Sequence, residues 1–588
     1  MHILGISEID NDAGVVLLKD SAVVCGINEE RLSRIKQHAG FPHRSVEWVL
    51  RYAGLTLNDI DWIAVAKADP SVNPELFYRV RERLSTYDYF SKADPASLWT
   101  KTLNWMVQKF RNAPRSVRVA GKMSDEIRDW GQKNSCLDKM IRVPHHYAHA
   151  ACAYWAGGYD NALAVTIDGQ GEGITSQVYL VTKGGFDLLK EIFVPHSLGV
   201  FYAAVTKALG FRPARHEGKI TGLAAYGKPD EKLLSEIRKL ASYDGKGGFV
   251  APSIYGNYPK ILYLAKQYGR ENISAAFQTV LEEVATQYIS YYVKTYKTEN
   301  IVLAGGVFAN VKLNQRTHGI PGVKNVFVFP HMADGGLGYG AAQIVYRDKT
   351  QDLKPSPIRD VYWGPEYTEQ EIEQSLKKYG LDYSRMEDPA STIAELLTQN
   401  KVVAHFDGRM EFGPRALGNR SILYPATDPK VNDWLNHQLN RSEFMPFAPV
   451  TLAEEARRCY PGLAGAEYTA QFMTITFDCT DSMKKQSPAV VHVDGTARPQ
   501  LISESINPRY YRILKEYFKR TGIPSVVNTS FNMHEEPIVC SPEDAIRAFL
   551  QGGLDYLAIG NFLVARVEAG KPSKQCATDK ACCGSAGN

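Results

Sequence analysis

The stretch ALAVTIDGQGEG, residues 162–173, decides the fold prediction for this chain. Its first part, 162–167, is apolar and has the length of one buried β-strand, and the run Asp168–Gly173 that follows is an acidic turn rich in glycine. A further strand is expected at 176–181. The stretch therefore predicts a strand–turn–strand unit whose turn carries a carboxylate.

The N-terminus repeats this order. Strands are expected at 3–6, 14–18 and 22–28, and the polar turn between the first two contains Asp12. Consecutive strands joined by tight acidic turns indicate an antiparallel start to a mixed sheet. Two such units in one chain predict a duplicated α/β fold.

The remaining pattern predicts two domains and a tail. A long amphipathic helix at 275–298 and a buried strand at 301–303 extend the first domain. Residues 70–135 are aromatic, basic and mostly helical in pattern, which indicates an insertion. The segment DLKPSP, residues 352–357, is the best linker in the chain. The predicted divisions are domains at 1–355 and 356–570 and a flexible tail at 571–588.

Composition excludes several classes of protein. With 588 residues, 44% hydrophobic and 22% charged, the chain is ordinary globular protein rather than low-complexity or collagen-like. Its 68 Lys and Arg against 64 Asp and Glu give a net charge of +4. This charge is too small to indicate a dedicated nucleic-acid-binding protein. No apolar run reaches the roughly 20 residues of a membrane helix, and no signal peptide is expected. Nine cysteines, six scattered and three in the tail without zinc-finger spacing, favour a reduced, cytoplasmic protein.

Two motifs supply candidate metal ligands. In the box HHYAH, His145 and His149 are four residues apart, so on a helix beginning near Pro144 they share one face and can bind one metal ion. No Glu follows the first His, which disfavours a metalloprotease because its general base would be missing. Asp334, in a glycine-rich turn, is a third candidate, and a His/His/Asp set with open positions suits Fe(II), Mn or Zn. The alternatives are a structural pair of histidines and a turn aspartate.

Two further motifs suit anions. Gly305, Gly306 and Asn310 follow a buried strand and open a helix, so a nucleotide can lie against the backbone there. This is neither a Walker A loop nor a dinucleotide fingerprint, and a turn without a ligand is an equal alternative. The segment 408–421 carries three arginines among glycine and proline, and arginine forks bind phosphate or carboxylate in a bidentate manner. Downstream segments that complete a predicted polyanion pocket lie at 440–443, 492–498 and 528–532.

Taken together and in order, these motifs resemble the O-carbamoyltransferase family of the NodU/CmcH/TobZ type. The resemblance covers about residues 1–568, and the ordered set is specific although each motif alone is weak. It rests on Glu29–Arg31, Phe41-Pro42, the histidine box, Asp168-Gly169, Gly218–Gly227, Gly305-Gly306, Asp334–Gly336, Phe412–Ser421 and Asn528–Asn532.

The resemblance implies a fold and an activity. The N-terminal domain would be an actin-like ATPase domain of the ASKHA type, and the C-terminal domain would be YrdC-like. The family makes carbamoyl adenylate from carbamoyl phosphate and ATP in the second domain. The first domain then holds the intermediate with a metal, usually iron as Fe(II), while an acceptor hydroxyl attacks. The expected acceptor is a small molecule or a sugar-containing natural product, Mg²⁺ is expected with ATP, and a homodimer is possible.

The resemblance also implies residue roles. His145, His149 and Asp334 would be the metal ligands, and Asp12 and Asp168 would be catalytic residues at the two acidic turns. Gly305, Gly306 and Asn310 would hold the adenosine. The other expected binding residues for carbamoyl phosphate and ATP are Lys219, Arg415, Arg420, Arg441, Arg498, Asn528 and Ser530.

This chain departs from the family pattern at two positions. Family members often have His where this chain has Asn11, which puts a histidine base there in doubt. A Lys-x-Arg-Glu pattern is common where this chain reads NRSE at 440–443, so the phosphate contacts there are in doubt. The insertion at 70–135 matches no family motif and could shape an acceptor pocket or a subunit contact.

Other functions remain open at this point. The same chemistry on a nucleic acid would need a basic stripe, whereas transfer to a protein cysteine is disfavoured because the chain has no Cys-x-x-Cys pair. A sugar kinase-like ATPase or a nucleotide-binding regulator is disfavoured, because neither needs the second, arginine-rich pocket. The candidate basic residues in the insertion are Arg79, Arg81, Arg83, Lys101, Lys109, Arg111, Arg115 and Arg118.

Overall fold

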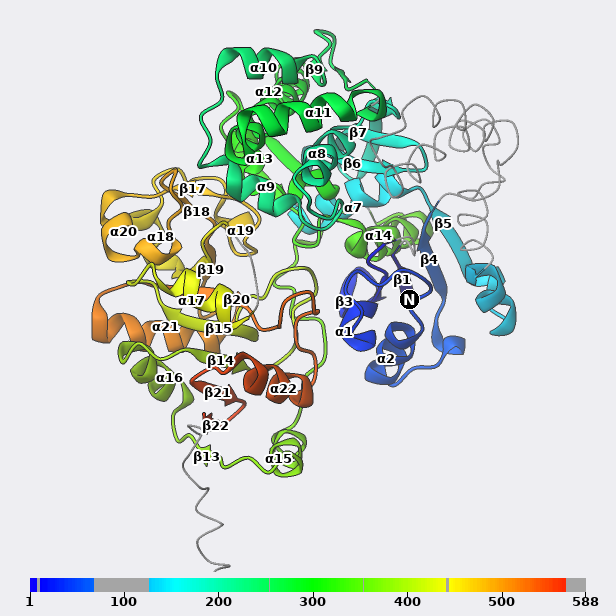
Figure 1. Ribbon diagram of the computed structural model, residues 1–588. Coiled ribbons are helices and arrows are strands. Elements are labelled where there is room, and N and C mark those ends of the chain that lie inside the picture. Colours follow the sequence, from blue (N-terminus) through cyan, green and yellow to red (C-terminus); the bar gives the residue numbers. More distant parts are fainter. Residues whose placement is uncertain (8–10, 68–125, 253, 353, 440–443, 567–588) are drawn as a thin grey trace, which may run out of the picture.

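The computed structural model describes residues 1–7, 11–67, 126–252, 254–352, 354–439 and 444–566. Arg441, the tail and most of the predicted insertion with its basic residues lie outside these ranges. Within the insertion, residues 126–133 are helical, as expected. Figure 1 shows the N-terminal half of the chain beside the C-terminal block. Among the described helices, none has the length and apolar character needed to cross a membrane.

The first sheet is built by the N-terminal residues. Its five strands run in the order β3-β2-β1-β4-β5, with β2 antiparallel to β1 and β3 and with β4 parallel to β1 and β5. Four of the five residues of the first strand are buried, as its apolar sequence requires. The strands are β1 (His2–Ile6), β2 (Gly14–Lys19), β3 (Ala22–Asn28), β4 (Trp62–Ala66) and β5 (Met140–Val143).

The second sheet has the same topology. Its order is β8-β7-β6-β11-β12, again an antiparallel three-stranded meander followed by two parallel strands. This repeat confirms the duplicated α/β fold, and two sheets of this order are the architecture expected of an actin-like ATPase domain. The strands are β6 (Asn161–Gly171), β7 (Ile174–Thr182), β8 (Gly185–Phe193), β11 (Asn300–Ala304) and β12 (Asn325–Val328).

The acidic turn of the second unit differs from the expectation. The strand β6 continues through Asp168 to Gly171 instead of ending at Ile167, and the register with β7 shifts between Ile167 and Gly171. The reversal itself needs only Glu172 and Gly173, which both have positive φ angles. Extra residues in one strand bend it and re-aim its side chains, so the irregularity falls where the carboxylate of Asp168 is needed.

Two helices pack between the sheets, and they set how closely the two halves approach (Figure 1). Helix α7 (His145–Gly157) is rich in alanine and almost entirely buried, and it contacts β6 and β11. Helix α14 (Leu337–Thr350) lies against α7 and against β1 and β4 of the first sheet. A Cβ added to Gly340 would lie 2.1 Å from the carbonyl oxygen of Ala148, and one added to Gly338 would lie 2.7 Å from that of Gly5. The helix α14 therefore touches both halves through its backbone.

Two more helices cover the second sheet, on the side away from α7. Helix α12 (Arg270–Tyr296) accounts for the predicted helix at 275–298, and it packs with α8 (Leu198–Ala208) on apolar residues of β6 and β11. The predicted strand at 301–303 is the centre of β11.

The C-terminal block is an α/β domain with an eight-stranded mixed sheet. Alternate residues of its central strands face opposite sides, so Val403 packs with α16 (Pro389–Thr398) and α21 (Pro508–Thr521), while Ala404 faces α17 (Val431–Gln438) and α22 (Pro542–Gly552). The strands in order are β13 (Ser384–Arg385), β22 (Phe562–Ala565), β21 (Tyr556–Ile559), β14 (Val403–Phe406), β15 (Arg420–Pro425), β20 (Ser525–Ser530), β16 (Ala448–Leu452) and β19 (Gln500–Ile502).

The segment after the predicted linker packs on the first domain. Ile358, Val361 and Trp363 lie in the same apolar cluster as α7 and α14, and the backbone N–H of Gly26 in β3 donates to the carbonyl of Trp363. The division between 355 and 356 therefore remains a proposal, because the first residues beyond it belong to the core of the N-terminal half.

The contact at Gly340 yields a stability prediction. We expect Gly340→Ala to lower the free energy of unfolding by about 1–3 kcal/mol, because the added methyl group meets the backbone of α7, which cannot move alone. The matched control is Gly218→Ala in the exposed first turn of α9 (Glu217–Ala224), where an added Cβ has nothing within 4 Å. The control should be neutral or stabilising by about 0.5–1 kcal/mol. Equal unfolding curves for the two variants in urea would contradict the close contact.

Candidate metal centre

Two histidines of the predicted box lie side by side at the start of α7. His145 and His149 are 2% and 1% exposed, and their ring centroids are 4.7 Å apart. The helix begins directly after β5, with Pro144 at its N-cap position, so the i and i+4 side chains share the face that points to the sheet ends. The third histidine, His146, points elsewhere: its ring nitrogens lie 2.8 Å from the hydroxyl of Thr166 and 2.9 Å from the carbonyl of Ile174.

Two carboxylates from the second half of the domain face these histidines. Asp168 comes from the irregular part of β6, and Asp334 begins the short 3₁₀ helix η5 (Asp334–Gly336) that leads into α14. The Nε2 atoms of both histidines lie 3.3 Å from Oδ2 of Asp168, and they lie 3.7 and 3.6 Å from Oδ1 of Asp334. The structure thus brings together the three expected ligands and adds Asp168, which was expected nearby as a catalytic residue.

The geometry of these four groups fits a metal ion. Their ligand atoms lie within 4.8 Å of one another. Two ligands bound about 2.1 Å from one ion in tetrahedral geometry are roughly 3.4 Å apart, close to the 3.3–3.7 Å observed. Two imidazoles and two carboxylates suit Fe(II), Mn or Zn, and the donor set alone does not choose among them.

The electrostatics of the cluster also favour a cation. Burial opposes ionisation of Asp168, but hydrogen bonds with His145 and His149 outweigh it and hold its pKa well below the ordinary value. Burial, and next the charge of Asp168, raise the pKa of Asp334. The side chains of Asp168 and Asp334 are 14% and 22% exposed, and adjacent carboxylates so largely shielded from solvent repel each other unless positive charge lies between them. A metal ion at the cluster would supply that charge.

The glycine turn predicted for a nucleotide lies against this cluster. Gly305 has a φ of 104°, which favours glycine, and a Cβ there would lie 2.4 Å from the carbonyl of Ile167. The backbone N–H of Gly306 donates to Oδ1 of Asp168 at 3.3 Å. The turn therefore fixes Asp168 and presents its backbone beside the carboxylates.

Two other expected nucleotide-binding residues lie deeper in the fold. The side chain of Asn310 caps α13 (Val311–His318) by accepting from Leu313 N–H, and its amide also exchanges hydrogen bonds with Gln278. Lys219 is buried in α9, with its ammonium group 5.5 Å from the ring centroid of Phe211. The amide of Asn310 is thus engaged within the protein, so its adenosine contact, like the expected ligand contact of Lys219, stays a proposal.

The expected phosphate-binding arginines of the second domain separate into two groups. The guanidinium of Arg420 is fully buried, lies 3.7 Å from the ring centroid of Phe406, and donates to the backbone carbonyls of four residues. A guanidinium engaged in this way ties loops together and presents no terminal N–H group to a ligand. Arg415 and Arg498 are half-buried and keep their expected role as a proposal.

The expected binding residues on β20 lie beneath the loop that carries Arg415. Asn528 donates to Oε1 of Gln500 at 2.7 Å and to the carbonyl of Ala416 at 3.3 Å. Ser530 pairs in register with Ser421 of β15. Asn528 therefore supports the backbone next to Arg415, and anion binding by this loop stays a proposal.

Asp12 has a partner that the sequence did not predict. Its φ of 54° places it in the left-handed region on the turn after β1, and its Oδ2 lies 3.5 Å from Nε2 of His331. His331 is part of the motif that supplies Asp334, but the sequence pattern gave no reason to separate it from the other residues of that turn. Only the fold, which places the turn after β12 opposite the turn after β1, brings the pair together.

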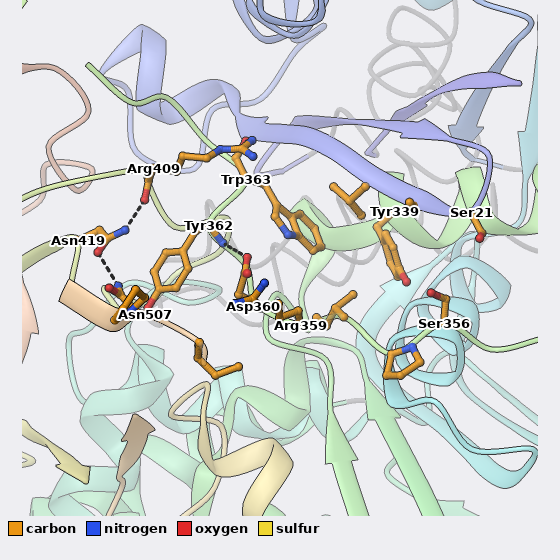
Figure 2. A pocket seen from close by; sticks show the side chains of 16 residues that line it. Ser21, Tyr339, Ser356, Arg359, Asp360, Tyr362, Trp363, Arg409, Asn419 and Asn507 are labelled. Carbon is orange, nitrogen blue, oxygen red and sulfur yellow. Dashed lines mark hydrogen bonds between the residues drawn. The ribbon is translucent and has the colours of Figure 1, made fainter. Parts of the chain in front are cut away.

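A separate cavity of about 490 Å³ lies where the linker meets both domains (Figure 2). Tyr339, Tyr362 and Trp363 line it, and none of the four cluster residues does. Its polar groups bind one another: Asn507 donates to Asn419, and Asn419 donates to the carbonyl of Arg409 (Figure 2). The cavity is therefore a feature of the domain junction and not of the histidine and aspartate cluster.

Comparison with known proteins covers nearly the whole chain. A family model described as Carbamoyltransferase N-terminus matches residues 2–343, and one described as Carbamoyltransferase C-terminus matches residues 394–566. An uncharacterized protein of Synechocystis sp. is 32% identical, with 96% of this chain and 97% of that protein covered. The Nodulation protein NolNO of Sinorhizobium fredii is 31% identical over 95% of this chain and 79% of that protein. The Nodulation protein U of Rhizobium tropici is 26% identical, with 91% of each chain covered.

Solved structures resemble the chain only weakly. Full-length HypF, solved in the phosphate- and nucleotide-bound form, has a TM-score of 0.32 and 14% identity, and covers 59% of this chain and 56% of its own. Component A of the (R)-2-hydroxyglutaryl-CoA dehydratase of Acidaminococcus fermentans has a TM-score of 0.33 and 14% identity, and the match covers 59% of this chain and 98% of component A.

The cluster predicts metal binding that depends on its side chains. Protein loaded anaerobically with Fe(II) or Co(II) and then desalted should retain about one equivalent of metal. Losing a residue that only supports a metal ligand typically weakens metal binding by roughly 10–100-fold. We expect His149→Ala and Asp168→Asn to weaken binding by more than this, because each removes a proposed ligand. Elemental analysis measures the retained metal. His43→Ala, at an exposed histidine on α2 (His43–Ala53), is the control and should bind like the unaltered protein. Full retention by His149→Ala would contradict the assignment.

Proposed function

Because the chain belongs to the carbamoyltransferase family, we propose that it is an ATP-dependent O-carbamoyltransferase that forms carbamoyl adenylate and transfers the carbamoyl group to an acceptor hydroxyl. The chain spans both the N- and the C-terminal family domains, and it is a carbamoyltransferase. The observation that carries the finer proposal is the cluster of buried His145 and His149 with partly buried Asp168 and Asp334. Asp12, whose pKa is raised in part by Asp334, lies near this cluster.

The first half-reaction belongs to the arginine-rich domain in this proposal. Carbamoyl phosphate and water give carbamate and phosphate, and a carbamate oxygen then attacks the α-phosphorus of ATP while pyrophosphate leaves. Arg415, Arg498 and Ser530 are the proposed contacts to these phosphates. Adenylation is needed because a carbamoyl carbon is a poor electrophile, and AMP is a better leaving group than an oxide or amide anion.

The second half-reaction belongs to the duplicated domain. The acceptor oxygen forms a bond to the carbamoyl carbon, the bond from that carbon to the phosphate oxygen breaks, and AMP leaves with the electron pair. The acceptor proton passes to the carboxylate of Asp12, the proposed general base. A metal bound at the cluster would act as a Lewis acid toward an oxygen of the reacting groups.

The surrounding residues would orient the reacting groups. The backbone of Gly305 and Gly306 borders Asp168, so no side chain intrudes where the intermediate would lie. The histidines and carboxylates are held by α7, β6 and η5 rather than by mobile segments, which favours preorganised geometry. Lys219, Asn310 and Asn528 remain proposed binding residues, and Arg441 lies outside the described residues.

The identity of the acceptor is a separate proposal. A small molecule or a sugar-containing natural product with a free hydroxyl is the class we favour. The basic residues that a nucleic-acid acceptor would need lie outside the described residues, so no observation raises that alternative. Fe(II) as the native metal, a cytoplasmic location and a homodimer likewise remain expectations from the sequence.

A variant of the cluster should keep the first half-reaction and lose the second. We expect AMP and pyrophosphate to form only when ATP and carbamoyl phosphate are both present. His149→Ala should keep carbamoyl-phosphate-dependent pyrophosphate release but lose transfer by about 100-fold or more, because the proposed metal site serves only the second step. Pyrophosphate release and mass spectrometry of carbamoylated glycerol, used as a small test alcohol, measure the two steps.

The reciprocal variant provides the matched control. Arg415→Ala should lose pyrophosphate release together with transfer, because no intermediate forms. ATP hydrolysis to ADP without carbamoyl phosphate would instead indicate a kinase-like enzyme. Full transfer activity in His149→Ala would contradict the proposed division of labour.

A further inference from the structure

We propose that His331 is a positioning residue for the transfer step: it holds the carboxylate of Asp12 in its charged, proton-accepting form. This role rests on the proposed function, in which Asp12 receives the acceptor proton. Asp12 itself is the catalytic residue, and His331 acts through it.

Asp12 lies closer to solvent than His331 does. The side chain of Asp12 is 16% exposed, and that of His331 is 2% exposed, with 3.5 Å between Oδ2 and Nε2. Asp12 is thus the member of the pair that a substrate can reach, and His331 contacts it from the protein side. Contacts of catalytic groups are often long before the substrate binds, so this distance suits a hydrogen bond that shortens in the working complex.

The position of His331 is fixed by close packing. A Cβ on Gly335 would lie 2.2 Å from Nε2 of His331, so a larger residue there would displace the ring. On another side the ring of Phe412 meets the imidazole edge to face, with centroids 5.1 Å apart. Nδ1 of His331 is buried and has no hydrogen-bond partner in the described part of the chain. Among the described residues, Asp12 is the carboxylate that lies beside Nε2 of this buried ring.

The charged groups around the pair determine its protonation. Burial raises the pKa of Asp12 well above its ordinary value, Glu30 and Asp334 add to the rise, and Arg31 opposes it. Burial lowers the pKa of His331 to about 3, and Arg31 and His149 contribute in the same direction. The imidazole is therefore neutral near pH 7 and carries one N–H group. Donated from Nε2 to Asp12, this N–H favours the carboxylate and counteracts its burial.

The protonation state of Asp12 determines how the rate of transfer depends on pH. Asp12 accepts a proton only as a carboxylate, so kcat/KM for transfer should rise with pH through the pKa of Asp12. Without the N–H of His331 that pKa rises further, and the acidic limb moves to higher pH. Each unit of displacement lowers the rate about tenfold at a pH below the limb.

The test compares two replacements of His331 that differ in one hydrogen bond. His331→Gln keeps a donor near the position of Nε2, whereas His331→Leu has a similar volume and no donor. The metal-loaded, full-length enzyme is assayed for glycerol carbamoylation from pH 5 to 9, and carbamoyl-phosphate-dependent pyrophosphate release is measured in parallel. Asp12→Asn serves as the reference for loss of the base.

We expect the acidic limb of the pH profile of His331→Leu to move up by about one pH unit. The limb of His331→Gln should return toward that of the unaltered enzyme. Pyrophosphate release should stay within about twofold in both variants. An unmoved limb in His331→Leu, or equal displacement in both variants, would overturn the role. If His331→Leu does not fold, His331→Asn, whose amide is too short to reach Asp12, replaces it. Absence of pyrophosphate release in the unaltered enzyme would instead reject the proposed function.

Discussion

The backbone contact between α7 and α14 governs the site. Gly340 of α14 meets the carbonyl of Ala148 in α7 so closely that no Cβ fits between them, and the thiol of Cys152 donates to the carbonyl of Gly336 at 3.2 Å. The histidines lie on the turn of α7 that includes Ala148, and Asp334 lies directly before α14. The close approach of the two helices therefore helps to place Asp334 within 3.6–3.7 Å of the two histidines, while Asp168 reaches them from β6.

The fold brings several carboxylates close together, and neighbouring groups offset part of their repulsion. Asp12 follows β1 and Asp168 belongs to β6, which are equivalent strands of the two duplicated halves, so the duplication brings acidic turns to one place. Burying carboxylates next to one another costs free energy unless hydrogen bonds and opposite charges offset the desolvation. The imidazoles of His145 and His149 and the N–H of Gly306 offset part of it for Asp168, and a cation at the proposed metal site would offset more for Asp168 and Asp334. For Asp12 the compensating charge is that of Arg31, and His331, 3.5 Å away, is the proposed hydrogen-bond donor.

Much of this arrangement could be predicted, and the missing parts have physical causes. Apolar runs bounded by polar or glycine-rich turns predicted β1 to β3, β7 and β11, and the i, i+4 spacing predicted that His145 and His149 share a helix face. The extension of β6 beyond Ile167 was missed because it depends on pairing with β7, not on local propensity. His331 was missed because one histidine in a turn has no periodic signal. Arg420 looked like a phosphate ligand, since sequence does not show that four carbonyls surround its guanidinium.

The loop at 408–421, which carries three arginines, contacts the sites proposed for both half-reactions. Its residue Phe412 packs on His331 and stacks on Trp363, and the carbonyl of Gly413 accepts from Arg31 at 2.7 Å. Arg415, two residues further along the chain, belongs to the proposed adenylation site. One short loop therefore contacts both the groups behind Asp12 and the groups proposed to bind phosphate. Because this loop is held by packing on both sides, the proposed sites are fixed relative to each other, which favours handing over a hydrolysable intermediate with little exposure to water.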